Sequence, residues 1–189
     1  AGHTHVTNSD SVILTADRSR VAMTTTSSDV TAISAADEAG FLALTQLLLG
    51  ADLVGNGIAA IEDAVSYACE REQFGAPIGG FQALQHLLAD AWVDLVAARN
   101  AVRSAAWKLG NGTNDAYSAA ARASLVASEA GVRGCETATQ ILGGIGHTWE
   151  HLTSVRLRRA LMSRALLPAP SEELLCARIG VTPTGAALD

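Results

Sequence analysis

Lysine is almost absent from the sequence, and basic residues as a whole are in the minority. Lys108 is the only lysine among 13 basic residues, and 19 acidic residues bring the net charge to −6. A surface with this sign of charge repels polyphosphate chains, so binding to nucleic acid through a basic face is not expected.

Cysteine is also scarce. Cys69, Cys135 and Cys176 lie far apart, and none has a second cysteine or a histidine close to it in the sequence. This spacing argues against a disulfide framework and against a zinc site, and it favours a reducing compartment. We therefore expect no metal site.

Long uninterrupted apolar runs are missing too. Asp, Glu or Arg interrupts each run before it reaches the roughly 18 residues of a membrane span, and residues 1–10 carry no apolar segment of a secretory leader. The expectation is a soluble, cytoplasmic protein without a membrane partner. A length of 189 residues is enough for one domain with a substantial core.

What the sequence does contain falls into two regimes. Residues 1–36 are rich in Thr, Ser and Val, and apolar residues alternate in Ser11–Ala16 and Val21–Thr25. Asp17–Ser19 between them is a candidate turn, so this part predicts a short β segment. Residues 37–180 have a helical period and form the second predicted unit, followed by a flexible tail over 181–189.

The helical part divides at glycine and proline. We predict a mainly α fold, an antiparallel four-helix bundle preceded by the short β segment, because long helices with short connections pack side by side. Ser34 or Asp37 is the predicted cap of the first helix. The expected helices run to about Glu70, then over Phe81–Leu109, from Thr113 or Asn114 to Leu142, and from about Thr148 to Leu166, with a short fifth over Ser171–Ile179.

The first stretch with chemical interest is Arg71–Ile78, which reads REQFGAPI. Arginine offers a fork that matches phosphate oxygens, and glutamine offers a donor and an acceptor to a sugar or purine edge. The plainer interpretation is a helix C-cap with an arginine lying over the surface.

The second stretch is Gln140–His151, which reads QILGGIGHTWEH. A Gly-Gly-x-Gly turn followed at once by a new helix presents free N–H groups and the positive end of a helix dipole, which suits an anion. Helix corners also need glycine for purely structural reasons. His147 and His151 are interpreted as structural or solvent contacts rather than as an acid or a base.

A basic run follows on the fourth predicted helix. It consists of Arg156, Arg158, Arg159 and Arg164. We expect a solvated face paired with nearby glutamates, with guidance of an acidic ligand or partner as the alternative.

The two motifs and the Arg158-Arg159-Ala160 sequence after them resemble, in order and spacing, the C-terminal helical domain of the acyl-CoA dehydrogenases over about residues 37–180. The resemblance implies that Arg71 and Gln73 hold the pyrophosphate and adenosine of FAD across a subunit interface, with Phe74 packed against it. It also implies that Gln140, Gly143 and Gly144 lie along the adenosine half of FAD.

Two departures from that family matter. A full member also has an N-terminal helical domain and a middle β domain, of which residues 1–36 would be a remnant or the end. The family places its catalytic glutamate in one of two slots, which fall here on Thr45 and Pro168, and neither residue is a base. Glu172 and Glu173 lie near the second slot and are expected to face solvent.

The resemblance therefore implies a subunit of a heteromeric acyl-CoA dehydrogenase that carries out α,β-dehydrogenation of an acyl-CoA thioester. A partner chain would supply the glutamate, and the substrate would be bulky, as in lipid or steroid catabolism. Two alternatives stay open. The first is that the chain is a non-catalytic helical-bundle interaction protein derived from the same family. The second is that it is a piece of a longer polypeptide.

Overall fold

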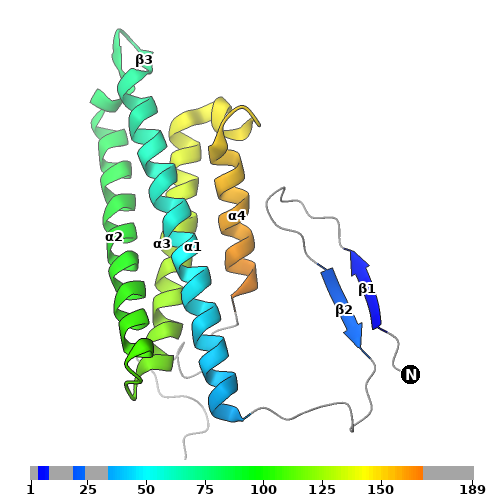
Figure 1. Cartoon of the computed structure of the whole chain (residues 1–189). Coiled ribbons are helices and arrows are strands. Elements are labelled where there is room, and N and C mark those ends of the chain that lie inside the picture. The colour runs from blue at the N-terminus through cyan, green and yellow to red at the C-terminus, as the bar shows by residue number, and fades with distance from the viewer. Residues whose placement is uncertain (1–3, 9–18, 24–33, 168–189) are drawn as a thin grey trace, which may run out of the picture.

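Four helices make up most of the computed structural model, which describes residues 4–8, 19–23 and 34–167 (Figure 1). Consecutive helices run in opposite directions, so the predicted antiparallel four-helix bundle is confirmed. Their bounds are α1 (Ala35–Glu70), α2 (Gln82–Gly110), α3 (Ala116–Leu142) and α4 (Leu152–Leu166).

The helix α1 begins and ends where the sequence predicts. The Ser34 side chain accepts a hydrogen bond of 3.1 Å from the N–H of Asp37, and Asp37 and Glu38 place negative charge in the first turn, at the positive end of the helix dipole. At the other end the N–H of Arg71 donates to the carbonyl of Tyr67 at 2.8 Å and closes the last turn.

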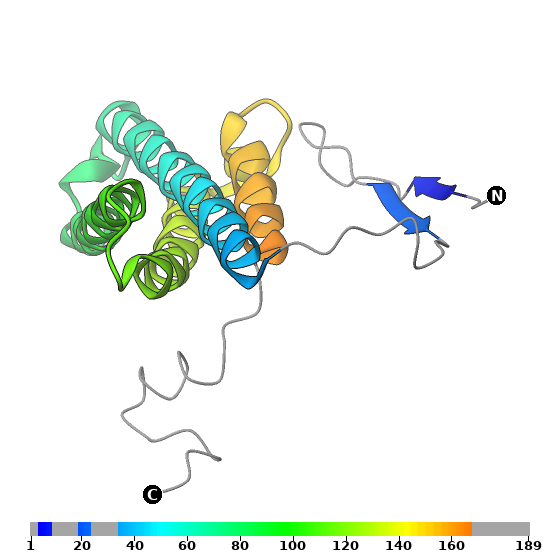
Figure 2. The same cartoon turned by 60° about the horizontal axis from the view of Figure 1, so that its bottom comes forward.

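The core lies where α1 and α3 meet. Figure 2 shows α2 and α4 on opposite sides of these two central helices. Small side chains dominate the contact, because alanine lets helix backbones approach closely. The larger fully buried side chains are Leu53, Ile61, Leu95, Thr153 and Cys135.

Two helix starts differ from the prediction. The fourth helix begins at Leu152 rather than near Thr148, because Gly143–His147 forms a separate 3-10 turn, η3. The third begins at Ala116, because the side chain of Asp115 bonds to Thr113 and Lys108 and keeps these residues in the connection. These hydrogen bonds lower the pKa of Asp115, with Lys108 the larger cause. The expected fifth helix over Ser171–Ile179 lies outside the described residues.

The short β segment contains a strand pairing that was not predicted. The strand β2 (Ser19–Met23) overlaps the expected strand Val21–Thr25, and it pairs antiparallel with β1 (Thr4–Asn8), Val6 opposite Val21. The strand β1 has a single apolar residue, so it gave no alternation signal. The predicted partner Ser11–Ala16 and the turn residues Asp17 and Arg18 lie outside the described residues.

The apolar length of α1 also differs from expectation. Residues Ala36–Glu70 are long and apolar enough to cross a membrane by length and composition alone, and 33% of the most apolar window is buried inside the protein. The few charged residues on α1 are therefore not enough to exclude it, by length and composition, from the helices that could cross a membrane. A central helix of a bundle has the same composition, and α1 contributes Leu53 and Ile61 to the core.

Candidate functional site

The two sequence motifs lie at the same end of the bundle. Helices α1 and α3 are parallel and both end there, so the segment after α1 and the turn η3 after α3 share that end (Figure 1). We call it the turn end, made of residues 71–81 and 140–151. All six residues predicted to contact a cofactor are exposed at the turn end: Arg71, Gln73, Phe74, Gln140, Gly143 and Gly144.

The first motif forms a tight hairpin with an exposed aromatic tip. Strands β3 (Glu72–Gln73) and β4 (Ala76–Pro77) pair antiparallel. The two loop residues between them, Phe74 and Gly75, both have positive φ, 55° and 81°, as a type I′ turn requires. A bulky side chain rarely adopts this conformation. The Phe74 side chain is 95% exposed and its ring meets Phe81 edge to face, with 6.2 Å between centroids.

Arg71 stands at the junction of α1 and this hairpin. Its main chain is fully used, since its N–H caps α1 and its carbonyl accepts from Ile78 at 2.8 Å. Within residues 34–167 its exposed guanidinium has neither a hydrogen bond nor an ion pair. Gln73 donates to the carbonyl of Glu72 at 2.7 Å, which leaves the oxygen of its amide available as an acceptor. The end of α1 thus presents a free cation to an anionic ligand.

The glycines of η3 have different roles. Gly143 has φ 61° and ψ −132°, a conformation that essentially only glycine adopts. A Cβ at Gly146 would stand 2.9 Å from the carbonyl oxygen of Thr139, so this glycine is fixed by packing. A Cβ at Gly144 would meet no atom within 4 Å. Gly143 and Gly146 therefore build the turn, and Gly143 and Gly144 both leave open space above it.

The expected anion site at the start of the fourth helix is not formed directly after the glycines. Helix α4 starts only at Leu152, and His151 caps it: Nδ1 accepts from the N–H of Thr153 at 3.2 Å. This contact already satisfies one of the free N–H groups at the start of the helix. The interpretation of His151 as a structural residue fits this cap.

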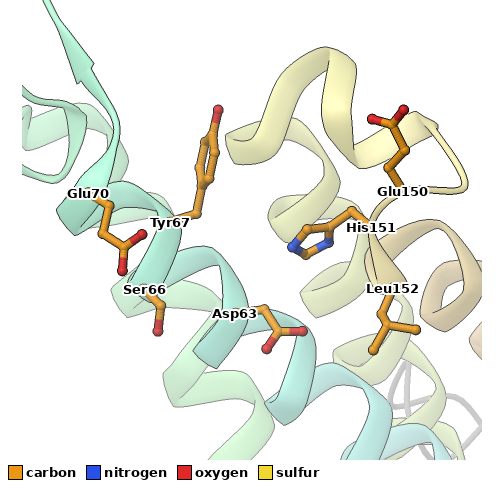
Figure 3. A pocket seen from close by; sticks show the side chains of 7 residues that line it. All are labelled: Asp63, Ser66, Tyr67, Glu70, Glu150, His151 and Leu152. Carbon is orange, nitrogen blue, oxygen red and sulfur yellow. The ribbon is translucent and has the colours of Figure 1, made fainter.

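A cleft of about 410 Å³ opens between α1 and the loop before α4 (Figure 3). Its lining carries three carboxylates, and no lysine or arginine belongs to it. Arg156 pairs with one of the three, Asp63, and the remaining negative charge disfavours phosphate, so the cleft offers less to an anionic ligand than the exposed Arg71 does. The lining residues are Asp63, Ser66, Tyr67, Glu70, Glu150, His151 and Leu152.

The basic run on α4 pairs with α1, although not with glutamates as predicted. Arg156 binds Asp63 at 3.2 Å and Arg159 binds Asp52 at 2.7 Å. The hydrogen bond that Arg159 donates to Asp52, together with the charge of that carboxylate, raises the pKa of Arg159. Arg158 lies over the ring of Trp149, 4.0 Å from its centroid. Arg164 is exposed, so it is the arginine of this run that remains a candidate for the alternative role of guiding an acidic ligand.

Of the two slots for a catalytic base, only Thr45 is in the described part of the chain. Its hydroxyl donates to the carbonyl of Phe41 at 2.9 Å, so it is engaged within α1. Pro168, Glu172 and Glu173 lie outside the described residues. A hydroxyl of this kind cannot take an α-proton at neutral pH.

Comparison with known proteins identifies relatives of this fold. A family model described as "Acyl-CoA dehydrogenase, C-terminal domain" matches residues 36–167. The acyl-CoA dehydrogenase IpdE2 of Mycolicibacterium smegmatis is 37% identical over 138 residues, 73% of this chain and 42% of that protein.

Two solved structures share the fold. Butyryl-CoA dehydrogenase from Megasphaera elsdenii superposes with a TM-score of 0.68 and 34% identity, over 75% of this chain and 37% of that one. The ChsE4–ChsE5 complex from Mycobacterium tuberculosis gives 0.67 and 29%, over 76% and 39%. The chain thus spans less than half the length of these relatives.

Proposed function

The chain belongs to the acyl-CoA dehydrogenase family, and we propose that it is the subunit or fragment of a flavin-dependent acyl-CoA dehydrogenase that grips FAD and joins the assembly. The observation that carries this proposal is the turn end, which combines two motifs far apart in the sequence. An Arg71 without a partner among the described residues and an exposed Phe74 come from one motif, and an open Gly144 comes from the other. Each of these features favours contact with a ligand over a purely structural role.

The residues present fit FAD chemically. Arg71 would bind the pyrophosphate through charge-assisted hydrogen bonds, Gln73 would bind beside it, and Phe74 would pack against the cofactor. Gln140, Gly143 and Gly144 would lie along the adenosine, which can approach the backbone because no side chain stands over Gly144. The acidic cleft beside Glu70 would disfavour phosphates, which supports a place for them at Arg71 instead.

The proposed reaction is the α,β-dehydrogenation of an acyl-CoA thioester. FAD, when bound, would accept a hydride from the acyl chain, while a carboxylate must remove the α-proton. Thr45 cannot do this, so the base would come from a partner chain. This chain would contribute cofactor retention and assembly rather than proton transfer.

A partner of the same family is supported by apolar surface that no described part of the chain covers. Phe41, Leu44 and Leu48 of α1 are exposed and three or four residues apart, so they share one face of the helix. A stripe of this kind calls for cover by another domain or chain. The likeness to the ChsE4–ChsE5 complex favours a hetero-oligomer, and a bulky steroid-like acyl-CoA is the substrate class that we propose.

A second candidate function is a non-catalytic interaction protein, favoured by the absence of a base at Thr45. The two are separated by the visible absorbance spectrum of the purified assembly, recorded together with its native subunit masses. Flavin bands with a second, larger chain support the dehydrogenase proposal. A colourless assembly of this chain alone, unchanged by added FAD, would overturn it and leave the interaction role.

A further inference from the structure

Helix α4 is attached to the bundle by few buried apolar groups. Four of its 15 residues are buried, and Ala160 is the only apolar one among them. The others are Thr153, Ser154 and Ser163. Leu157 packs only partly buried against the core. In contrast, α3 buries apolar or small residues along most of its length.

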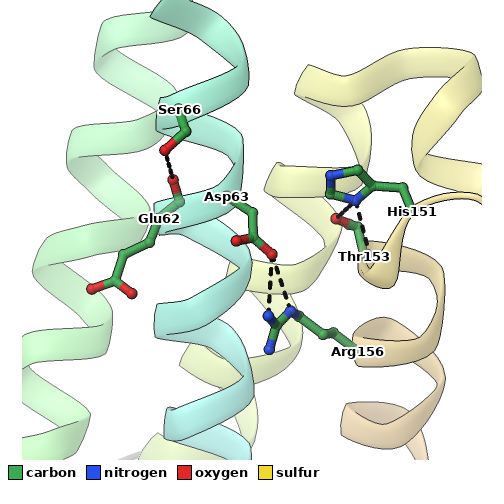
Figure 4. A network of polar contacts seen from close by, with 6 residues as sticks. All are labelled: Glu62, Asp63, Ser66, His151, Thr153 and Arg156. Atoms are coloured by element: carbon green, nitrogen blue, oxygen red, sulfur yellow. Dashed lines mark hydrogen bonds and ion pairs between the residues drawn. The ribbon is translucent and has the colours of Figure 1, made fainter.

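Charged contacts to α1 take the place of an apolar seam. Asp52 accepts from Arg159 Nε at 2.9 Å through one carboxylate oxygen and from the hydroxyl of Ser163 at 2.6 Å through the other. Asp63 accepts from Arg156 Nε at 3.3 Å (Figure 4). These contacts join residues 93 to 111 positions apart in the sequence.

The spacing of these residues fixes a register. Asp52 and Asp63 are 11 residues apart on α1, close to three helical turns, so both side chains point to the same side. Arg156, Arg159 and Ser163 likewise follow each other on one face of α4 at intervals of three and four. A slide of α4 by one turn would break both sets of contacts at once.

Short hydrogen bonds connect the start of α4 to the glycine turn. The Ser154 hydroxyl donates to the carbonyl of Thr148 at 2.9 Å. The N–H of Thr148 in turn donates to the carbonyl of Ile145, inside η3, at 3.1 Å. The start of α4 and the Gly143–His147 turn therefore move together.

We propose that Asp52 and Asp63 are positioning residues that hold α4 in register by charge and thereby set the geometry of the Gly143–His147 turn. Neither would touch the cofactor. For the consequence on flavin binding, this inference rests on the proposed function. For the docking of α4 and the turn it stands on the contacts alone.

Hydrogen exchange of backbone amides on the full chain tests the inference without any cofactor. Asp52→Asn with Asp63→Asn keeps the side-chain volumes and removes both charges. We expect exchange in α4 and in residues 144–148 to rise by about 2- to 10-fold, as the loss of two partly exposed ion pairs together would give. Exchange in α2 should stay unchanged and show that the variant is folded. About 1 M salt, which shortens the Debye length to about 3 Å, should raise exchange in the wild type and have little effect in the variant.

A matched control removes an ion pair elsewhere. Asp94 binds Arg133 at 2.8 Å between α2 and α3, so Asp94→Asn should leave exchange in α4 unchanged. Exchanging the partners, Asp63→Arg with Arg156→Asp, should restore the protection that Asp63→Asn loses, a rescue that lost packing would not give.

The readouts separate the claims. Unchanged exchange in α4 overturns the charge docking, and faster α4 exchange with an unaffected turn overturns the positioning of the turn. In an assembly that binds FAD, the double variant should bind it several-fold more weakly. An assembly that binds no FAD would defeat the proposed function, while the exchange data would still decide the docking.

Discussion

Gly131 of α3 lies directly against the backbone of Leu53 in α1. A Cβ built on Gly131 would stand 2.5 Å from the carbonyl oxygen of Leu53, which is closer than any real contact allows. The two central helices of the bundle can therefore touch only because position 131 has no side chain.

A single methyl group at this crossing should separate the helices. Gly131→Ala is expected to lower the free energy of unfolding by about 1–3 kcal/mol, the usual cost of overpacking, measured by urea denaturation. Gly55→Ala is the matched control, since a Cβ there meets nothing within 4 Å. It should stabilise α1 by about 0.5–1 kcal/mol, because alanine restricts the unfolded chain more than glycine. Equal effects of the two changes would contradict the close crossing.

The role proposed for Arg71 predicts a loss of cofactor affinity. Removing one charge-assisted phosphate contact costs about 1.5–3 kcal/mol, so Arg71→Ala should weaken FAD binding by roughly tenfold or more in a titration followed by flavin fluorescence. Arg122→Ala, on an exposed position of α3, should leave the affinity unchanged. Unaltered flavin occupancy in Arg71→Ala would remove this residue from the site.

Gly144 allows the ligand surface to be blocked without disturbing the fold. Because a Cβ there meets no protein atom within 4 Å and its φ is not positive, Gly144→Ala should unfold at the same temperature as the wild type. If adenosine lies on this turn, the same change should weaken FAD binding by several-fold. Gly143→Ala should instead lower the melting temperature, because of its positive φ. Full FAD affinity in Gly144→Ala would move the adenosine elsewhere.

Thiol chemistry should distinguish two cysteines. Burial raises the pKa of Cys135 to about 12, so only roughly one part in 10⁴ is thiolate at pH 8, whereas Cys69 is exposed. In a Cys176→Ser background, iodoacetamide should modify Cys69 alone in the native protein and both cysteines in urea. Rapid modification of native Cys135 would mean that α3 opens far more easily than its packing indicates.

The same thiol makes stability depend on alkaline pH. The folded pKa lies above the unfolded value, so the contribution is complete below about pH 8.5 and is lost as pH rises toward 12. Over that range the free energy of unfolding should fall by up to about 1.4 kcal/mol per pH unit from this group. Cys135→Ala should show a correspondingly flatter alkaline limb in denaturant titrations.

Local signals predicted the helices well and the polar contacts between them poorly. Ser34 and the glycines and prolines between helices set most boundaries, because capping and chain reversal depend on neighbouring residues. The partners of Arg156 and Arg159 lie on another helix, so the sequence around the arginines does not identify them. Phe74 was predicted as a cofactor contact, but its positive φ was not, because the sequence around it gives no signal for the hairpin that imposes this conformation.

The conformation of Phe74 has a thermodynamic consequence for association. Its backbone is held in a two-residue turn, so little backbone entropy remains to be lost when a ligand or a neighbouring chain covers the exposed ring. The isolated chain is destabilised in return, by the strain in the turn and by the apolar surface that the Phe74 ring exposes to water. Phe74→Gly should therefore make the free chain more stable and every complex formed through this end weaker, which links the two properties through a single side chain.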